Sequence, residues 1–321
     1  MNRQQGSQKS PSRQTGTPED LWALHGWRHP FLFLHAVFYY GNTRRYINIL
    51  ATTYELIQKY IPLKVYKSRV FQVFLRWMPE RYHGKVLTLE DSRRIFALDK
   101  DIEVDRKLAH RVLPFEHANQ IVIKNPDSIA IGDCGCRLRK KNSCKPVHVC
   151  MFIGEPFASY AVAHGKKTLN VHYATREEAL AVLQEAHEAG FVHNAYFKDA
   201  AGDRLFALCN CCKCCCGVMS ITRDFKEFFS HENPEPKMLA PSGFVAVHDL
   251  SLCVGCGACS DACPFDAVQC QEEKQPSVIW EKCFGCGICV EKCASRAITL
   301  KRDEAKGIPL NLEALLQEDA R

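Results

Sequence analysis

Eight cysteines near the C-terminus follow one spacing, C-x2-C-x2-C-x3-C, in two copies. The first copy consists of Cys253, Cys256, Cys259 and Cys263, and the second of Cys283, Cys286, Cys289 and Cys293. This spacing lets three thiolates surround one iron–sulfur cube and sends the fourth to a different cube. A chain with both copies is expected to hold two 4Fe-4S clusters, which move electrons one at a time at low potential.

Glycines stand at matching places inside the two copies, at Gly255 and Gly257 and at Gly285 and Gly287. Glycine accepts a positive φ without strain and lets backbone N–H groups turn toward an anionic cluster. Structural zinc sites usually join two separated C-x2-C pairs. The complete spacing with its glycines therefore favours iron–sulfur clusters over zinc.

Residues 244–301 resemble the bacterial two-cluster ferredoxin module. The resemblance implies crossed ligand sets, with Cys253, Cys256, Cys259 and Cys293 on one cluster and Cys283, Cys286, Cys289 and Cys263 on the other. Pro264 follows the first copy as in that family, whereas Ala294 follows the second; the difference concerns a turn and not a ligand. Cys270 lies outside both copies and is expected to be a small buried residue.

Ten more cysteines lie between positions 134 and 216. Cys209, Cys212 and Cys215 repeat the C-x2-C-x2-C triple, and Cys211 and Cys214 form an offset C-x2-C pair. Four remote cysteines could complete the sets: Cys134, Cys136, Cys144 and Cys150. These residues could bind one or two further 4Fe-4S clusters, with Arg137 and Lys213 as positive charges that raise the potential.

Other chemistries fit the same upstream cysteines. They could form a zinc site, or a thiol-based active site that performs disulfide or sulfur-transfer chemistry, or stay inert. Three segments, Asp133–Arg137, Glu177–Asn194 and Cys209–Cys216, resemble a region of multi-cluster iron–sulfur proteins from anaerobic bacteria and archaea that often precedes a ferredoxin module. That resemblance implies metal binding and electron transfer but names no substrate.

The composition agrees with a reduced, metal-binding protein. The chain has 321 residues, 19 cysteines and a formal charge of +6. Each oxidised cubane with four thiolates adds about −2, so two clusters bring the charge to roughly +2 and four to roughly −2. The basicity is therefore a weak argument for nucleic acid, and no nucleic-acid-binding motif is present.

The N-terminal residues lack an apolar signal-peptide core, which predicts a cytoplasmic location. The apolar run 31–40 is too short to cross a bilayer. It predicts a core helix or a helix that docks on a membrane surface or a membrane-bound partner.

Hydrophobic periodicity and capping signals place these motifs on an α+β framework. Helices are expected at 31–40, 43–60 and 64–78, after a cap at Thr88, and from a capping box at Thr175 and Glu178 to a C-terminal cap at Gly190. Strands are expected at 129–131, 191–197 and 204–208, the last running into the cysteine-rich stretch. Four short strands, at 244–247, 267–269, 278–280 and 297–300, predict a pseudo-twofold β-α-β repeat.

The expected domains are a disordered tail (1–20), a helical domain (21–110), an α/β cysteine-rich metal-binding domain (111–229), a linker (230–243), a ferredoxin-like two-cluster domain (244–301) and a charged tail (302–321). A short helix is possible at 310–317 within that tail.

The function predicted from these patterns is electron transfer between partner oxidoreductases, with the N-terminal helices as a docking element. Two alternatives remain open. One is an oxidoreductase with its active site at Cys209–Cys216, fed by the ferredoxin domain, and the other is a redox or iron sensor. No nucleotide-binding G-x-G-x-x-G opening a helix is present.

Overall fold

The computed structural model describes residues 15–73, 81–115, 121–202, 204–228, 238–270 and 275–319. It contains mixed helices and strands, in agreement with an α+β protein. Within these ranges, every helix is too short or too polar to pass through a lipid bilayer.

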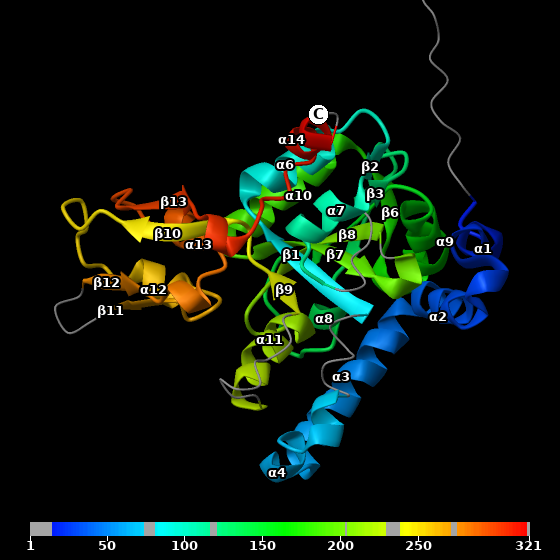
Figure 1. Cartoon of the computed structure of the whole chain (residues 1–321), viewed down its shortest axis with the longest axis horizontal. Coiled ribbons are helices and arrows are strands. Elements are labelled where there is room, and N and C mark those ends of the chain that lie inside the picture. The colour runs from blue at the N-terminus through cyan, green and yellow to red at the C-terminus, as the bar shows by residue number, and fades with distance from the viewer. Residues whose placement is uncertain are drawn as a thin grey trace, which may run out of the picture.

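A seven-stranded sheet forms the centre of the larger part of the molecule (Figure 1). Its order is β6 (His172–Ala174), β4 (Ile129–Asp133), β5 (His148–Ile153), β8 (Arg204–Cys211), β7 (Val192–Lys198), β1 (Tyr82–Leu87) and β9 (Leu239–Ala240). The β1–β9 pair is parallel, and the other neighbouring pairs are antiparallel. Every residue of β7 is buried, so both faces of the sheet are covered.

Two hydrophobic cores lie on opposite faces of this sheet, because side chains alternate along a strand. One core includes side chains of α6 (Leu89–Ala97), α7 (Arg106–Val112), α10 (Arg176–Glu188) and α14 (Leu312–Asp319). The other includes side chains of α1 (Pro18–His25), α2 (Pro30–Gly41), α9 (Phe157–Leu169) and α11 (Gly217–Phe228). Along β8, Leu208 belongs to the first core, and Cys209 and Cys211 to the second. The cysteines of this strand therefore face the α2 side.

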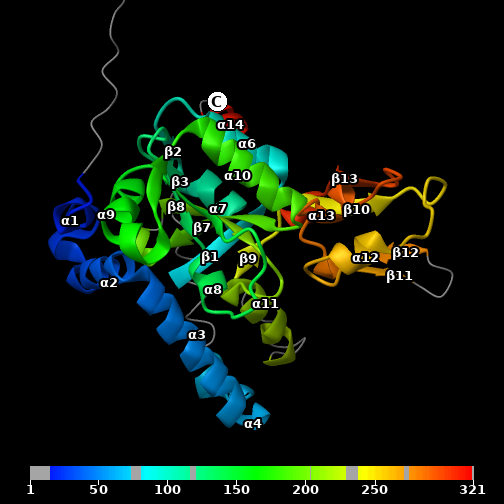
Figure 2. The same ribbon diagram turned by 180° about the vertical axis from the view of Figure 1, so that it is seen from behind.

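The remaining elements are short or stand away from the sheet. β2 (Ile102–Val104) pairs with β3 (Ile121–Ile123). The helix α3 (Thr43–Tyr60) and the short α4 (Leu63–Tyr66) extend away from the body (Figures 1 and 2). The single-turn elements are η1 (Gly26–Arg28), α8 (Gly135–Leu138), η2 (Asp199–Ala201), η3 (Trp280–Lys282) and η4 (Glu304–Lys306).

The capping predictions are confirmed in part. The Thr88 hydroxyl accepts a hydrogen bond from the Asp91 backbone N–H at the start of α6. The Thr175 hydroxyl accepts one from Glu178 at the start of α10, but the Glu178 carboxylate pairs with His172 and so does not close a reciprocal box. Gly190 follows α10 with φ +81°, the left-handed conformation expected of a C-terminal cap.

The C-terminal module lies beside the sheet as a smaller unit (Figures 1 and 2). Its first half contains β10 (Phe244–His248), α12 (Ala258–Ala262) and β11 (Val268–Cys270), and its second half β12 (Pro276–Val278), α13 (Ile288–Glu291) and β13 (Ile298–Arg302). β10 pairs with β13, and β11 pairs with β12. The strand–helix–strand order thus occurs twice, and each strand of one half pairs with a strand of the other half.

The prediction of a helical domain at 21–110 is wrong after about residue 81. β1 is an inner strand of the sheet, paired with β7 and β9. His83 and Lys85 alternate with apolar residues along it, yet both are buried, and burial lowers the pKa of Lys85 to about 7. Because these polar residues interrupt the apolar run, the sequence pattern did not show a strand.

The two segments expected to be linker and tail also belong to the body. β9 lies within the predicted linker 230–243, whose residues 230–237 are outside the described ranges. The predicted tail 302–321 contains α14, and Leu310, Leu312 and Leu315 are buried in the first core. The amphipathic face of this helix therefore packs against the sheet layer instead of remaining in solvent.

The ends of three other predictions differ or lie outside the described ranges. α1 begins at Pro18, inside the predicted tail 1–20, of which residues 1–14 are not described. The predicted helix 64–78 corresponds to α4 and a turn of helix at 69–73, and residues 74–80 are not described. Cys270 is exposed, so its prediction as a buried residue is wrong.

Candidate metal centres

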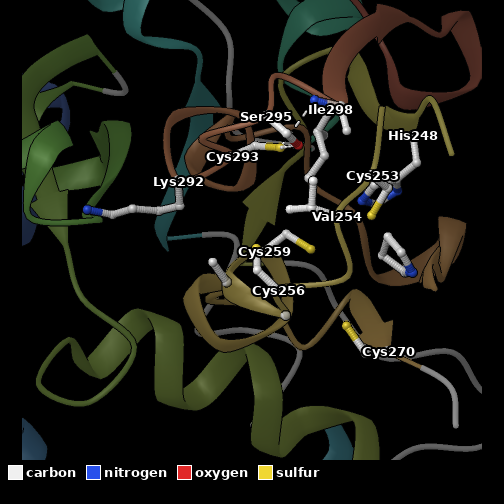
Figure 3. Close-up of a pocket in the computed structure, with 14 residues that line it drawn as sticks. His248, Cys253, Val254, Cys256, Cys259, Cys270, Lys292, Cys293, Ser295 and Ile298 are labelled. Carbon is white, nitrogen blue, oxygen red and sulfur yellow. Dashed lines mark hydrogen bonds between the residues drawn. The ribbon is translucent and has the colours of Figure 1, made fainter. Parts of the chain in front are cut away.

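Two small pockets in the C-terminal module divide its eight motif cysteines into two sets. One pocket is lined by Cys253, Cys256, Cys259 and Cys293. The other is lined by Cys263, Cys283, Cys286 and Cys289. Each set combines the first three cysteines of one copy with the last of the other. Figure 3 shows the first set around one space, with Cys270 at its edge.

The backbone around the two pockets has matching geometry. The glycines at positions 255, 257, 285 and 287 have φ values of +66°, +76°, +66° and +83°. At Gly285 a Cβ atom would lie 2.2 Å from the Phe244 carbonyl oxygen, so no larger side chain fits. The last cysteine of each copy accepts an N–H bond of 3.2 Å, Cys263 from Ala267 and Cys293 from Ala297. Such N–H groups stabilise thiolate charge and tune a cluster.

The thiols of these pockets are largely buried. Burial raises the pKa of Cys259 to about 11 and that of Cys289 to about 12, and it also raises the pKa of Cys286 well above its ordinary value. These three metal-free thiols are therefore neutral at pH 7, and metal binding must release their protons.

Four upstream thiols form one compact set, here called the four-thiol group. It consists of Cys144, Cys212, Cys214 and Cys215, whose sulfurs all lie within 4.8 Å of one another. The Cys214 sulfur lies 2.8 Å from Cys144, 3.6 Å from Cys215 and 3.9 Å from Cys212. Cys212 and Cys215 are buried, whereas Cys214 is exposed.

The other upstream thiols form a second set, here called the six-thiol group. It consists of Cys134, Cys136, Cys150, Cys209, Cys211 and Cys216. Cys134 makes thiol contacts with Cys136 and Cys150, Cys150 also with Cys209, and Cys136 also with Cys216. The sulfurs of Cys216 and Cys211 lie 3.4 Å apart. All six line a cavity of about 80 Å³, to whose wall Cys212 and Cys215 of the four-thiol group, Arg137 and three tyrosines (Tyr39, Tyr82 and Tyr196) also contribute.

The triple Cys209, Cys212 and Cys215 is divided between these two groups. Cys209 lies inside β8, opposite Cys150 of β5, and shares a sheet face with Cys211 because side chains alternate along a strand. Cys212 and Cys215 lie in the turn after the strand. The strand period of two, and not the triple's spacing of three, decides which sulfurs meet.

Cys211, Cys214 and Cys216 were not among the predicted ligands, although the structure places each of them in a thiol group. The offset C-x2-C pair of Cys211 and Cys214 was the available signal. The seven predicted upstream ligands all belong to one group or the other.

Arg137 places a buried positive charge beside the six-thiol group. It is 1% exposed, its guanidinium lies 4.0 Å from the centre of the Phe191 ring, and its Nη2 donates to the Asn210 carbonyl oxygen. Its Nε and Nη1 atoms are buried and have no hydrogen-bond partner within the described part of the chain. A buried cation with free donors beside six thiols fits an anionic metal cluster. Lys213, in contrast, is partly exposed and pairs with Asp266 of the C-terminal module.

A chain of polar contacts links the C-terminal module to the six-thiol group. Glu291 of α13 lies 3.6 Å from His187 Nε2, His187 Nδ1 lies 3.0 Å from His193 Nε2, and His193 Nδ1 lies 2.6 Å from Asn210 Oδ1. Burial lowers the pKa of His193 to about 3, so this ring is neutral. Asn210 lies between Cys209 and Cys211, so this chain of contacts connects α13 with the cysteine-bearing strand β8.

Comparisons with known proteins identify the chemistry of the C-terminal module. Residues 246–269 match the family described as "4Fe-4S binding domain". A stretch of 36 residues is 44% identical to a protein named ferredoxin from Pyrobaculum islandicum. The aligned stretch covers 11% of this chain and 34% of that ferredoxin. The match thus spans about a third of the relative's length. Together with the paired pockets, these similarities support an iron–sulfur, ferredoxin-type region with an electron-transfer role near the C-terminus.

Proposed function

We propose that this chain transfers low-potential electrons between partner oxidoreductases through two 4Fe-4S clusters in the C-terminal module and one further cluster upstream. The observation that carries the proposal is the division of the eight motif cysteines into two pockets, each with four of them. Each set supplies the four ligands that one cubane needs.

The ligand sets follow from the linings of the two pockets. The first cluster would be held by Cys253, Cys256, Cys259 and Cys293, and the second by Cys283, Cys286, Cys289 and Cys263. The positive-φ glycines keep side chains out of the loops, and the N–H groups of Ala267 and Ala297 stabilise the thiolates of the last cysteines. When bound, such clusters accept and release single electrons.

The six-thiol group supports a further cluster beyond the ferredoxin module. It offers more than the four thiolates of one cubane, and the unpartnered donors of Arg137 supply the matching positive charge. The sequence predicts one or two further clusters upstream, and the six-thiol group suits one. Cys286 and Ile288 pack into the same hydrophobic core as Cys211 and Cys216, which favours the second pocket as the one nearer to the six-thiol group.

We therefore propose that the three sites form a row. The first pocket lies at the exposed end, where Cys256 is exposed and Val254 is 73% exposed. The second pocket follows, and the buried six-thiol group closes the row. Electrons would enter or leave at the exposed end and at a partner surface near the sheet.

The N-terminal helices supply that partner surface. Large apolar side chains are exposed along it: Trp27, Phe31, Leu34, Phe38, Ile49, Leu50 and Tyr60. Between residues 21 and 73 the sequence has seven lysines and arginines against one acid, Glu55, whose carboxylate pairs with Arg139 and Lys140. This charge favours an acidic redox partner, in a reducing compartment such as the cytoplasm. Binding of the purified chain to anionic vesicles instead would assign the surface to a membrane.

A second candidate is an oxidoreductase with its active site in the six-thiol group. It is favoured by the two thiols that a cubane with four ligands leaves free and by the adjacent cavity of about 80 Å³. Turnover of a small substrate by the purified chain with reductant alone would favour the enzyme over the carrier.

The decisive experiment is iron and acid-labile sulfide analysis of the full chain after anaerobic purification, with EPR of the reduced protein. About twelve irons per chain are expected, from three cubanes. A value near eight would restrict the clusters to the C-terminal module, and a value well below eight would contradict the two-cluster assignment.

A further inference from the structure

We propose that the four-thiol group binds one tetrahedral divalent metal ion, of the zinc class, separate from the iron–sulfur sites. Zinc in a closed structural site takes four cysteine thiolates at about 2.3 Å, which places the sulfurs about 3.8 Å apart. The Cys214 sulfur lies 3.6 Å from that of Cys215 and 3.9 Å from that of Cys212, and all four sulfurs lie within 4.8 Å. The two Cys214 distances are close to the separation expected for ligands of a single ion, whereas the sulfurs of Cys144 and Cys214 lie 2.8 Å apart and would separate when the ion binds.

A cubane does not suit these four sulfurs. In a cubane each thiolate binds a different iron at a different corner, so its ligands must surround the whole cube. The four sulfurs lie within 4.8 Å of one another, which is the spacing of ligands around one ion and is closer than the spacing of ligands around a cube. The six-thiol group lines a larger cavity, to whose wall Cys212 and Cys215 also contribute.

The surrounding charge fits the proposed ion. Four thiolates and one divalent ion carry a net charge of −2. Lys141 and Lys145 flank Cys144 in the sequence, and Lys213 lies between Cys212 and Cys214. These lysines offer cations to the site from both segments that form it.

The ion would join two segments that have little regular structure. Residues 139–147, all within the described ranges, form neither helix nor strand, and Cys144 lies among them. The other three ligands lie in the turn between β8 and α11, which also carries Lys213 and its ion pair with Asp266. A bound ion would fix this turn, and with it Cys211, Cys216 and the contact with the C-terminal module. Because zinc has no redox chemistry, this role goes beyond electron transfer.

The first test needs no variant. The full chain, purified anaerobically without chelator, should contain one zinc per chain, and zinc K-edge absorption should show four sulfurs at about 2.3 Å. One mononuclear iron with a tetrathiolate EPR signal would place iron in the same proposed site. Absence of both metals, or a Cys144–Cys214 disulfide found by thiol mapping, would overturn the proposal.

Variants then locate the ion. Cys214→Ser should lose at least ten-fold in retained zinc and leave iron and sulfide unchanged. Ser143→Ala, next to Cys144, is the matched control and should retain the zinc. Cys209→Ser should lower iron and sulfide but keep the zinc. If the Cys214→Ser variant instead loses about four irons together with sulfide, these thiols are ligands of an iron–sulfur cluster and the zinc proposal is wrong.

The proposed function and this inference can fail separately. If the chain holds zinc with four sulfur ligands but no upstream iron, the proposed zinc site stands and the proposed upstream cluster is wrong. If the chain holds twelve irons but neither zinc nor mononuclear iron, the electron-transfer proposal stands and the proposed metal-ion site is wrong.

Discussion

The two cysteine-rich regions of this molecule reach their thiol groups by different routes. In the C-terminal module the cysteines lie in glycine-containing loops and at the ends of short helices, so their spacing alone brings three of each set together. Upstream, Cys150 and Cys209 lie on neighbouring strands, Cys136 lies in α8, and Cys144 lies in a loop. The comparison shows that cysteine spacing predicts which thiols come together where the backbone is a loop, and that it fails where the cysteines lie in a strand.

The largest expected effect tests that comparison directly. Cys289→Ser should remove about four irons and the matching sulfide from the C-terminal module, because it removes a buried ligand of the second pocket. Cys209→Ser should remove about four irons from the six-thiol group alone. Iron and sulfide analysis with EPR of the reduced protein checks both.

Cys270→Ser is the control for these variants, since Cys270 is exposed and lies outside both motif copies. It should retain the full iron content. A loss of iron here would show that Cys270, and not one of the four motif cysteines, completes the first pocket.

The next effect concerns the polar chain that joins the two regions. Asn210→Ala removes the hydrogen bond that Asn210 Oδ1 accepts from His193 Nδ1 and the one that its Nδ2 donates to the Val149 carbonyl oxygen, and it leaves buried groups unpaired. The free energy of unfolding should fall by about 1–3 kcal/mol, as measured by chemical denaturation under anaerobic conditions. The C-terminal clusters should keep their spectra, and their loss would mean that the two regions do not fold independently.

Arg137→Met should change the reduction potential of the proposed upstream cluster and leave the reduction potentials of the C-terminal clusters unchanged. Removing the buried positive charge disfavours the reduced, more negative form of an adjacent cluster. Redox titration followed by EPR should show a shift on the order of 60 mV toward negative potential, a tenfold change for one electron. Arg137→Lys, which retains the charge, should shift it less. Equal shifts in the C-terminal signals would contradict a separate upstream centre.

The smallest expected effect is a pH dependence of stability that arises from Lys85 in the sheet and not from the C-terminal module. Burial lowers the pKa of Lys85 to about 7, so between pH 7 and the ordinary lysine pKa the unfolded state binds more protons than the folded state. The free energy of unfolding should therefore rise with pH across that window and decrease as pH falls through 7. Lys85→Met should reduce this slope and raise stability at pH 7 by about 1 kcal/mol. Denaturation at pH 7 and pH 9 checks it, and an unchanged slope would contradict the assignment to Lys85.

Much of the candidate site was predictable, but unevenly. The two motif copies predicted the contents of two pockets, including their exchange of last cysteines, through resemblance to a known module. The caps at Thr88 and Thr175 and the strands 191–197 and 204–208 were close to the observed elements. β1 was missed because buried His83 and Lys85 interrupt its apolar pattern, and α14 was given too little importance because its apolar residues are few. The resemblance of the upstream segments to multi-cluster proteins remains a prediction.

The sequence by itself determined the local chemistry: which residues are thiols, where glycine permits a tight loop and where a helix can begin. The tertiary structure decided the upstream thiol groups, because residues as distant as Cys136 and Cys216 meet only when β4, β5 and β8 align across the sheet. It also decided the position of Arg137, whose charge is buried at the six-thiol group by packing against Phe191. Local spacing constrains a few residues of backbone, whereas contacts between separate strands depend on the register of the whole sheet.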